Sequence, residues 1–142
     1  MTTQITTHNI ISDLNGIYSF LSDKYESTIV YEGIEYPSVY NAYIIQFFNN
    51  IEDRKELANK TIDEIENYID NETYELRPNA ELYSLPRIIA KELNAIKFSD
   101  PSLAKKLIET SDTIIESKNQ YYDLGKILME IREQLKEGFN HA

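Results

Sequence analysis

The side chains that could do chemistry in this chain are carboxylates, phenols, amides, hydroxyls, lysines and arginines. Among its 142 residues there is no cysteine, and the two histidines, His8 and His141, stand close to the two ends. The absence of cysteine excludes disulfides, thiolate metal sites and cysteine nucleophiles. Chain ends are usually frayed, so we do not expect a histidine-based triad or zinc site. A site must therefore be built from the remaining polar side chains.

Acidic side chains are concentrated between residues 52 and 72. A helix through this stretch would spread Asp63, Glu64 and Glu66 around its circumference, so their carboxylates would not converge on a metal ion. We interpret the stretch as a solvated helix face. No metal and no cofactor are predicted.

Aromatic side chains gather on the predicted helix over residues 38–48. Tyr40 and Tyr43 belong to an aromatic stripe at helical spacing, a pattern more typical of a hydrophobic core than of a ligand cage. Asn41 and Gln46 face different sides of this helix, so at most one of them can line a pocket wall with Tyr43. A ligand would lie in a cleft between this helix and the last helix.

The elements that must position these side chains are those of an α+β, mainly helical fold, with a small N-terminal β-hairpin followed by about five helices. Residues 28–36 are rich in β-branched and aromatic residues and predict two short strands that turn at Glu32-Gly33. Ser38 is a plausible N-cap, and Asp100-Pro101 opens another helix. Helices are predicted over residues 38–48, 52–70, 87–98, from 101 onward and from about 123 onward, with an irregular section over 71–86.

Charge and hydropathy exclude several classes of partner. The chain has 24 acidic against 14 basic side chains and a net charge of −10, which argues against general nucleic-acid binding. A local basic pocket for a small phosphate compound stays open, as does homo-oligomerisation. No apolar run approaches the roughly 20 residues of a membrane span, and the N-terminus lacks the pattern of a signal peptide. We therefore predict a cytoplasmic location and no membrane partner.

Three segments of the chain, in this order, resemble one family. Residues 21–48, which begin Leu21-Ser22-Asp23-Lys24-Tyr25, are similar to an opening that reads approximately "LSNFYPSPF…(D/N)G…(W/Y)" and then "P-S/T-V-E-H-A/Y-Y-Q-A-Q-K-F". Lys97-Phe98 with residues 101–110 is similar to "KF…NP-x-L…L-L-x-T-G-D", and residues 124–132 to "LGK-x-LM-x-x-R". The chain thus resembles the NADAR (YbiA-like) family, with a single domain over residues 17–138 and an N-terminal lead-in over 1–16.

The resemblance implies hydrolysis of N-glycosidic bonds on ribosyl compounds, such as riboflavin-pathway intermediates and ADP-ribosyl adducts of nucleobases. This reaction develops positive charge on the ribose, so a nearby carboxylate is expected to stabilise that charge or to activate water. The Glu and His of "S-V-E-H" correspond here to Tyr40 and Asn41, and the later Lys to Phe47. The scaffold residues match whereas the expected catalytic residues do not, which suggests lost or altered catalysis.

The same resemblance points to particular positions of this chain. Asp23 stands where the family often has Asn, and it is either a turn-capping aspartate or a relocated catalytic carboxylate. Lys97 is either a cation at a helix C-terminus or, as its place in the family implies, close to the substrate. Arg132 either contacts phosphate or, as we rather expect, pairs with Glu116 or another nearby acid. The predicted ligand-binding residues are Ser22, Asp23, Tyr25, Tyr40, Asn41, Tyr43, Lys97 and Arg132.

Three functions follow as hypotheses. The first is a binding protein with a degenerate catalytic site that recognises an ADP-ribose-like or related nucleotide. The second is an active N-glycosidase that uses Asp23, and the third is a structural or protein-interaction remnant without a small-molecule site. A closed, aromatic-filled cleft between the helix over 38–48 and the last helix would refute both the binding and the glycosidase hypotheses. Twenty Ile, twelve Asn and eleven Tyr beside four Gly are typical of AT-rich coding genomes, as in many phages. A phage protein that counters NAD-derived host signalling is a further hypothesis.

Overall fold

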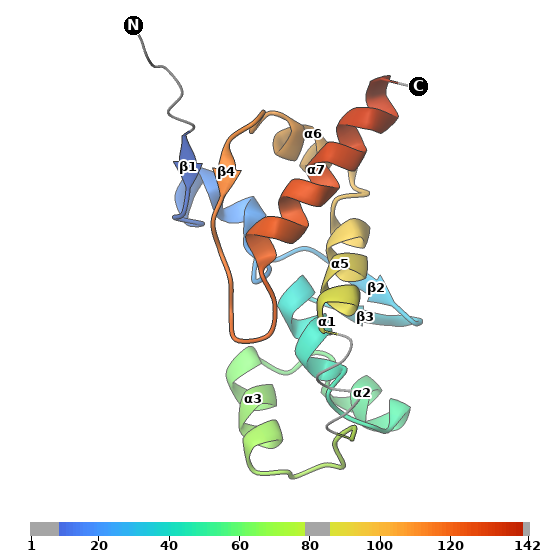
Figure 1. The fold of residues 1–142 in the computed structure, drawn as a ribbon. Helices are drawn as coiled ribbons and strands as arrows, with labels where there is room; N and C mark the ends of the chain where they lie inside the picture. The colour runs from blue at the N-terminus through green and yellow to red at the C-terminus, as the bar shows by residue number, and fades with distance from the viewer. Residues whose placement is uncertain (1–8, 79–85, 141–142) are drawn as a thin grey trace, which may run out of the picture.

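A computed structural model of the chain describes residues 9–78 and 86–140 (Figure 1). The described part is α+β and mainly helical, which confirms the predicted fold class. It contains six α-helices and one 3-10 helix, more helices than the five predicted. In chain order the elements are β1 (Ile10–Ile11), η1 (Gly16–Leu21), β2 (Ile29–Tyr31), β3 (Ile34–Tyr36), α1 (Val39–Ile45), α2 (Ile51–Leu57), α3 (Ile62–Asp70), α5 (Pro86–Lys97), α6 (Pro101–Ile108), β4 (Ile114–Ile115) and α7 (Leu124–Asn140).

The predicted hairpin is confirmed. Strands β2 and β3 pair antiparallel, with Ile29 opposite Tyr36 and Tyr31 opposite Ile34. The turn residues Glu32 and Gly33 both have positive φ, 51° and 80°, the conformation that tight two-residue hairpin turns require. The side of the hairpin that carries Ile29 packs into the core.

Helix α1 begins as predicted but ends early. The Ser38 side chain accepts a hydrogen bond from the backbone N–H of Asn41, so Ser38 is the N-cap. The helix stops at Ile45 and does not reach residue 48, because the backbone beyond it bonds to other segments. The carbonyl of Phe47 accepts from the N–H of Arg77 at 2.8 Å, and the carbonyl of Phe48 accepts from Nε of Arg54 at 2.8 Å.

The acidic stretch forms two helices, α2 and α3, where a single helix over 52–70 was predicted. The break is explained by Thr61, which caps α3 in a reciprocal arrangement with Glu64. The Thr61 hydroxyl accepts from the Glu64 N–H, and the Glu64 carboxylate accepts from the Thr61 N–H, each at 3.1 Å. A capping box of this kind satisfies N–H groups that a continuous helix would bond internally, so a new helix starts here.

The other predicted helices are confirmed within a few residues. Helix α5 runs one residue ahead of the 87–98 prediction, from Pro86 to Lys97. The Asp100 carboxylate caps α6 by accepting from the N–H of Leu103 at 3.0 Å, and α7 begins at Leu124. Within the section predicted to be irregular, residues 71–78 contain no helix and only the isolated bridge between Phe48 and Leu76. The rest of that section, like His8 and His141, lies outside the described residues.

The strand pair β1–β4 had no signal in the sequence. Ile10 pairs with Ile114 and Ile11 with Ile115 in parallel, so a segment of the expected lead-in lies beside a strand near the C-terminal helix (Figure 1). Helix α7 approaches β4 closely at Gly125, where a Cβ atom would lie 2.1 Å from the backbone oxygen of Ile115. Only glycine fits at this crossing.

Helix α1 lies at the centre of the core. All its residues are buried, and it packs against α5, α3 and the hairpin, while α7 packs against α5, α6 and β4. This arrangement places the turn after η1 and the loop before α7 around the N-terminal end of α1. Within the described residues, no helix has both the length and the apolar character needed to cross a membrane.

Candidate functional site

A hollow of about 320 Å³ opens beside the N-terminal part of α1. Its walls come from the segment before η1, the turn after η1, helix α1, the loop after β4 and the start of α7. We refer to it as the Asp23 hollow. Its lining residues are Ser12, Leu14, Asn15, Ser22, Asp23, Lys24, Tyr40, Ser117, Lys118, Asn119 and Leu124.

Asp23 is the buried carboxyl group of this hollow, with 7% of the residue exposed. Its Oδ2 accepts a hydrogen bond from the phenolic O–H of Tyr122. Burial raises the pKa of the Asp23 carboxyl above its ordinary value of 3.8, and the Tyr122 bond and the charges of Lys24 and Lys97 reduce this rise. The carboxyl is therefore easier to protonate than a surface aspartate, which suits a group that could act as an acid or stabilise a cation.

The turn that carries Asp23 is organised by Ser22. The Ser22 hydroxyl accepts from the N–H of Lys24 at 3.1 Å, and the Ser22 carbonyl accepts from the N–H of Tyr25 at 3.1 Å. The carbonyl of Asp23 in turn accepts from the N–H of Tyr40 at 2.8 Å, which attaches the turn to the first turn of α1. These bonds fix the backbone, so that Asp23 is buried and Lys24 is exposed.

Lys97 lies on the other side of this turn. The side chain is almost fully buried, and Nζ donates to the Ser22 carbonyl at 2.8 Å. Its ammonium lies 5.3 Å from the ring centroid of Tyr25 and 5.0 Å from that of Phe98. Burial lowers the pKa of Lys97 to about 7, although the nearby Asp23 charge opposes the change. Lys97 and Tyr25 line a separate hollow of about 530 Å³ between β2 and the α5–α6 region.

Tyr40 and Asn41 hold α3 against α1. The Tyr40 O–H donates to Oε2 of Glu66 at 3.4 Å, and Nδ2 of Asn41 donates to the carbonyl of Lys60 at 3.2 Å. Burial, followed by the Glu66 charge, raises the pKa of the Tyr40 phenol, so the phenol is neutral at physiological pH. Tyr40 also lines the Asp23 hollow, whereas Asn41 does not.

The space between α1 and the loop before α7 is filled by aromatic side chains. The ring centroid of Tyr43 lies 4.9 Å from that of Tyr122 and 5.6 Å from that of Tyr121, and Phe47 lies 5.1 Å from Tyr121. Tyr43 is only 2% exposed. The expected cleft at this place is thus occupied by side chains, and the open space lies next to it, in the Asp23 hollow.

The loop after β4 is fixed at both ends. The N–H of Gly125 donates to the carbonyl of Ser117 at 2.8 Å. The Asn119 carboxamide oxygen accepts from the N–H groups of Tyr121 and Tyr122 at 2.7 and 3.0 Å, a turn in which asparagine replaces a backbone acceptor. The lining residues at 117–119 are therefore held in place by the start of α7.

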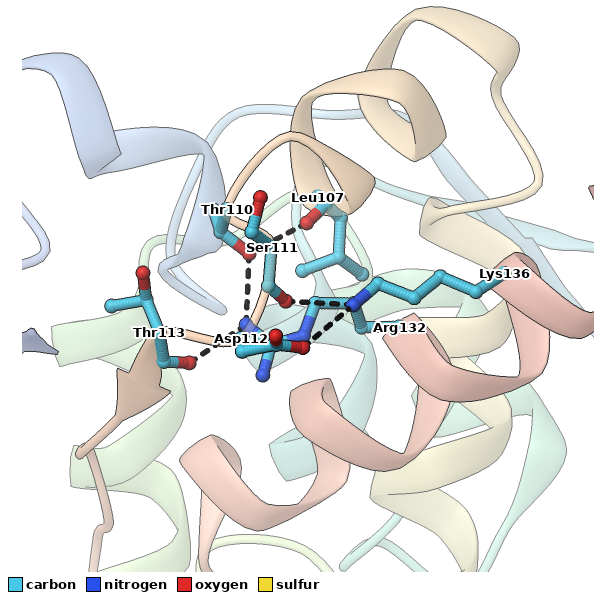
Figure 2. A network of polar contacts seen from close by, with 7 residues as sticks. All are labelled: Leu107, Thr110, Ser111, Asp112, Thr113, Arg132 and Lys136. Atoms are coloured by element: carbon cyan, nitrogen blue, oxygen red, sulfur yellow. Dashed lines mark hydrogen bonds and ion pairs between the residues drawn. The ribbon is translucent and has the colours of Figure 1, made fainter. Parts of the chain in front are cut away.

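Arg132 holds the turn that precedes β4 (Figure 2). Its guanidinium donates to the Thr110 hydroxyl at 2.9 Å and to the Thr113 carbonyl at 2.8 Å. Lys136, one helical turn later, donates to the Ser111 carbonyl at 2.9 Å. The expected ion pair of Arg132 with Glu116 or another nearby acid is not among the salt bridges of the described residues. The guanidinium bonds to neutral oxygens of the turn, and the charges of Asp112 and Glu133 act on it without such a contact.

The structure places the predicted site residues in different surroundings. Ser22, Asp23 and Tyr40 line the Asp23 hollow, Tyr25 and Lys97 line the neighbouring hollow, and Asn41, Tyr43 and Arg132 bond or pack within the fold. Sequence reasoning missed the wall residues at 12–15 and 117–119, since nothing local marks these segments as neighbours. In the described part of the chain, no group of three or more His, Asp or Glu side chains is arranged to hold a metal ion.

Comparison with known proteins gives a clear structural likeness. No family model matches the chain, and no curated protein does. Among solved structures, the chain is similar to the NMR structure of the E. coli protein YbiA, with 21% sequence identity and a TM-score of 0.76. The match covers 97% of this chain and 91% of that chain. The chain therefore has the YbiA fold.

Proposed function

We propose that this protein belongs to the NADAR (YbiA-like) family and binds an ADP-ribose-like or related nucleotide in the Asp23 hollow. The observation that carries the proposal is the meeting of hydroxyl, amide and ammonium groups with the Tyr40 ring in one hollow of about 320 Å³. Small-molecule sites occupy roughly 300–1,000 Å³ and combine apolar surface with a few polar groups. The hydroxyls and amides suit a ribose, and the ring suits a base.

Two observations support binding without the family's usual catalysis. The position of the family's glutamate holds Tyr40, whose neutral phenol cannot stabilise a ribosyl cation as a carboxylate does. The position of its histidine holds Asn41, whose carboxamide is bonded to Ser38 and to the carbonyl of Lys60. Both side chains hold the fold together, which is consistent with a degenerate catalytic site.

The second candidate function is an N-glycosidase that uses Asp23. It is favoured by one observation, a buried carboxyl group with a raised pKa in the wall of the hollow. When ionised this group would stabilise the oxocarbenium-like ribose, and when protonated it would donate to the leaving nitrogen. A structural or protein-interaction remnant is the third candidate, and the aromatic filling around Tyr43 is consistent with it.

One experiment separates these functions. The protein is incubated with ADP-ribosylated nucleobases, NAD, cyclic ADP-ribose variants and riboflavin intermediates, and the mixtures are analysed by mass spectrometry before and after heating. Intact ligand released by heat, without turnover, supports the binding protein. Turnover that is lost in Asp23→Asn and kept in the exposed control Asp63→Asn supports the glycosidase. Neither ligand nor turnover supports the remnant.

The biological setting forms part of the proposal. The AT-rich residue usage supports a phage origin. From that origin and the proposed ligand class we propose that the protein acts in the host cytoplasm and sequesters a NAD-derived host signal. Release of an intact cyclic or linear ADP-ribose compound from protein purified out of infected cells would support this role. Recovery of the protein without any such compound would oppose it.

A further inference from the structure

Two lysines lie at the rim of the Asp23 hollow. Lys24 and Lys118 both line the hollow and are both exposed. Among the described residues neither forms a salt bridge, whereas Lys55, Lys91 and Lys136 do. The Lys24 ammonium lies 5.2 Å from the ring centroid of Tyr40, so its stem follows the aromatic wall.

The two lysines come from segments 94 positions apart, and the fold fixes both backbones. Lys24 is held by the N–H bond to the Ser22 hydroxyl. Lys118 is held by its two neighbours. The Ser117 carbonyl accepts a hydrogen bond from the N–H of Gly125, and the Asn119 side chain accepts one from the N–H of Tyr121. The backbone is thus set in advance while the two ammonium groups remain available to a ligand, an arrangement that reduces the entropy lost on binding.

The surrounding charge makes this pair distinctive. With a net charge of −10, most of the surface repels anions. Two ammonium groups without a salt bridge to the described residues lie at this hollow, and Asp23, buried and bonded to Tyr122, is the one acidic residue among the described residues of its lining. Lys118 also lines a neighbouring hollow, which Glu116 and Asp123 share. Lysine acts as a point charge that binds phosphate oxygens without demanding the planar geometry that arginine needs for a carboxylate.

We propose that Lys24 and Lys118 together bind a phosphate group of the ligand and so determine specificity for phosphorylated compounds. This inference rests on the proposed function, because it assigns part of the same hollow. Neither lysine comes from the family pattern: Lys24 stands where "LSNFY" has Phe, and Lys118 belongs to a stretch that has no counterpart in that pattern. The phosphate subsite is therefore specific to this chain.

The test uses inorganic pyrophosphate as the probe and follows backbone amide NMR shifts of the full chain. We expect shifts confined to residues 22–24 and 117–119. Lys24→Met and Lys118→Met keep the apolar stem, and each should weaken pyrophosphate binding about tenfold, since a charge-assisted hydrogen bond contributes on this scale. Lys105→Met, an exposed lysine on α6 without an ion pair, should leave binding unchanged. Binding should also weaken as salt is raised from 0.05 to about 0.5 M.

The outcomes distinguish this inference from the proposed function. Absence of shifts at these residues, or binding equally strong in both methionine variants, would overturn the phosphate subsite. If adenosine and ribose shift the hollow's amides while pyrophosphate does not, the binding function stands and the subsite is wrong. If pyrophosphate binds through the lysines and no ribosyl compound adds affinity over it, the subsite stands and the proposed nucleotide function is wrong.

Discussion

Tyr122 donates its phenolic O–H to the Asp23 carboxylate at 2.5 Å, although the two residues are 99 positions apart. Both side chains are buried, so the bond is shielded from solvent. It connects the turn after η1 with the loop before α7. The two walls that carry Lys24 and Lys118 are therefore joined from the inside.

Removal of this bond should destabilise the fold and raise the pKa of Asp23 further. In Tyr122→Phe the buried carboxyl loses its donor, and an unsatisfied buried group costs about 1–3 kcal/mol. The free energy of unfolding by urea at pH 7 measures the loss, and carboxyl ¹³C NMR follows the Asp23 titration. Tyr18→Phe, at a half-buried tyrosine, is the control and should change neither quantity. An unchanged Asp23 pKa in Tyr122→Phe would contradict the assignment.

Lys97 should make stability increase with pH above neutrality. Its pKa is about 7 in the fold and about 10.5 in the unfolded chain, so between these values the unfolded state binds more protons. Stability then rises with pH, by at most about 1.4 kcal/mol per pH unit. Between pH 7.5 and 9.5, wild type should gain about 1–2 kcal/mol relative to Lys97→Met in urea unfolding, with Lys105→Met behaving as wild type. If the free energy of unfolding changed with pH in the same way for wild type and Lys97→Met, the assignment of this pH dependence to Lys97 would be wrong.

Gly125→Ala should destabilise the fold strongly, although the substitution adds only one methyl group. The new Cβ would lie 2.1 Å from the Ile115 carbonyl oxygen, and backbone cannot yield as a flexible side chain does. We expect a loss of about 1–3 kcal/mol and weaker binding of any ligand whose site includes residues 117–119. Gly138→Ala, in the same helix with no atom within 4 Å of its Cβ, should instead gain up to about 1 kcal/mol. Thermal unfolding measures the stability of both variants. An equal change in stability for the two would exclude the steric explanation.

Asn41→Ala should loosen α3 without changing the chemistry of the hollow. The variant loses the bond to the Lys60 carbonyl, worth about 1–3 kcal/mol when the acceptor is left without a partner. Amide hydrogen exchange in residues 62–70 should become faster while exchange in α6 stays the same. Asp63→Asn, at an exposed position of α3, serves as control. Loss of ligand binding with unchanged exchange would show instead that Asn41 acts in the site.

The sequence predicted those parts of the fold that depend on neighbouring residues. The Glu32-Gly33 turn and the Ser38 and Asp100 caps are local devices, each recognisable within four or five positions. The end of α1 at Ile45 was not predictable, because residues 47 and 48 bond to Arg77 and Arg54, which only the tertiary fold brings near. The pairing of two-residue strands β1 and β4 is non-local for the same reason.

The lining of the candidate site was predictable only where the family resemblance reached. It located Ser22, Asp23 and Tyr40, which do line the hollow, but not Lys24 as a ligand contact or any residue at 12–15. It also grouped Asn41 with the ligand-binding residues, where the structure shows a side chain bonded to a neighbouring segment. Which of two adjacent polar residues faces a ligand depends on their burial and on their hydrogen-bond partners. The spacing of residues in the sequence predicts neither of these properties.

The walls of the hollow begin at Ser12 and end at Leu124, so almost the whole chain separates its first and last lining residues. During synthesis on the ribosome, a growing chain that stops short of Leu124 has no such hollow, however well its hairpin and α1 have formed. Under the proposed binding function, only a chain extended through Leu124 could capture the ligand. For the same reason, proteolytic removal of α7 should release a bound ligand even before the remaining helices unfold.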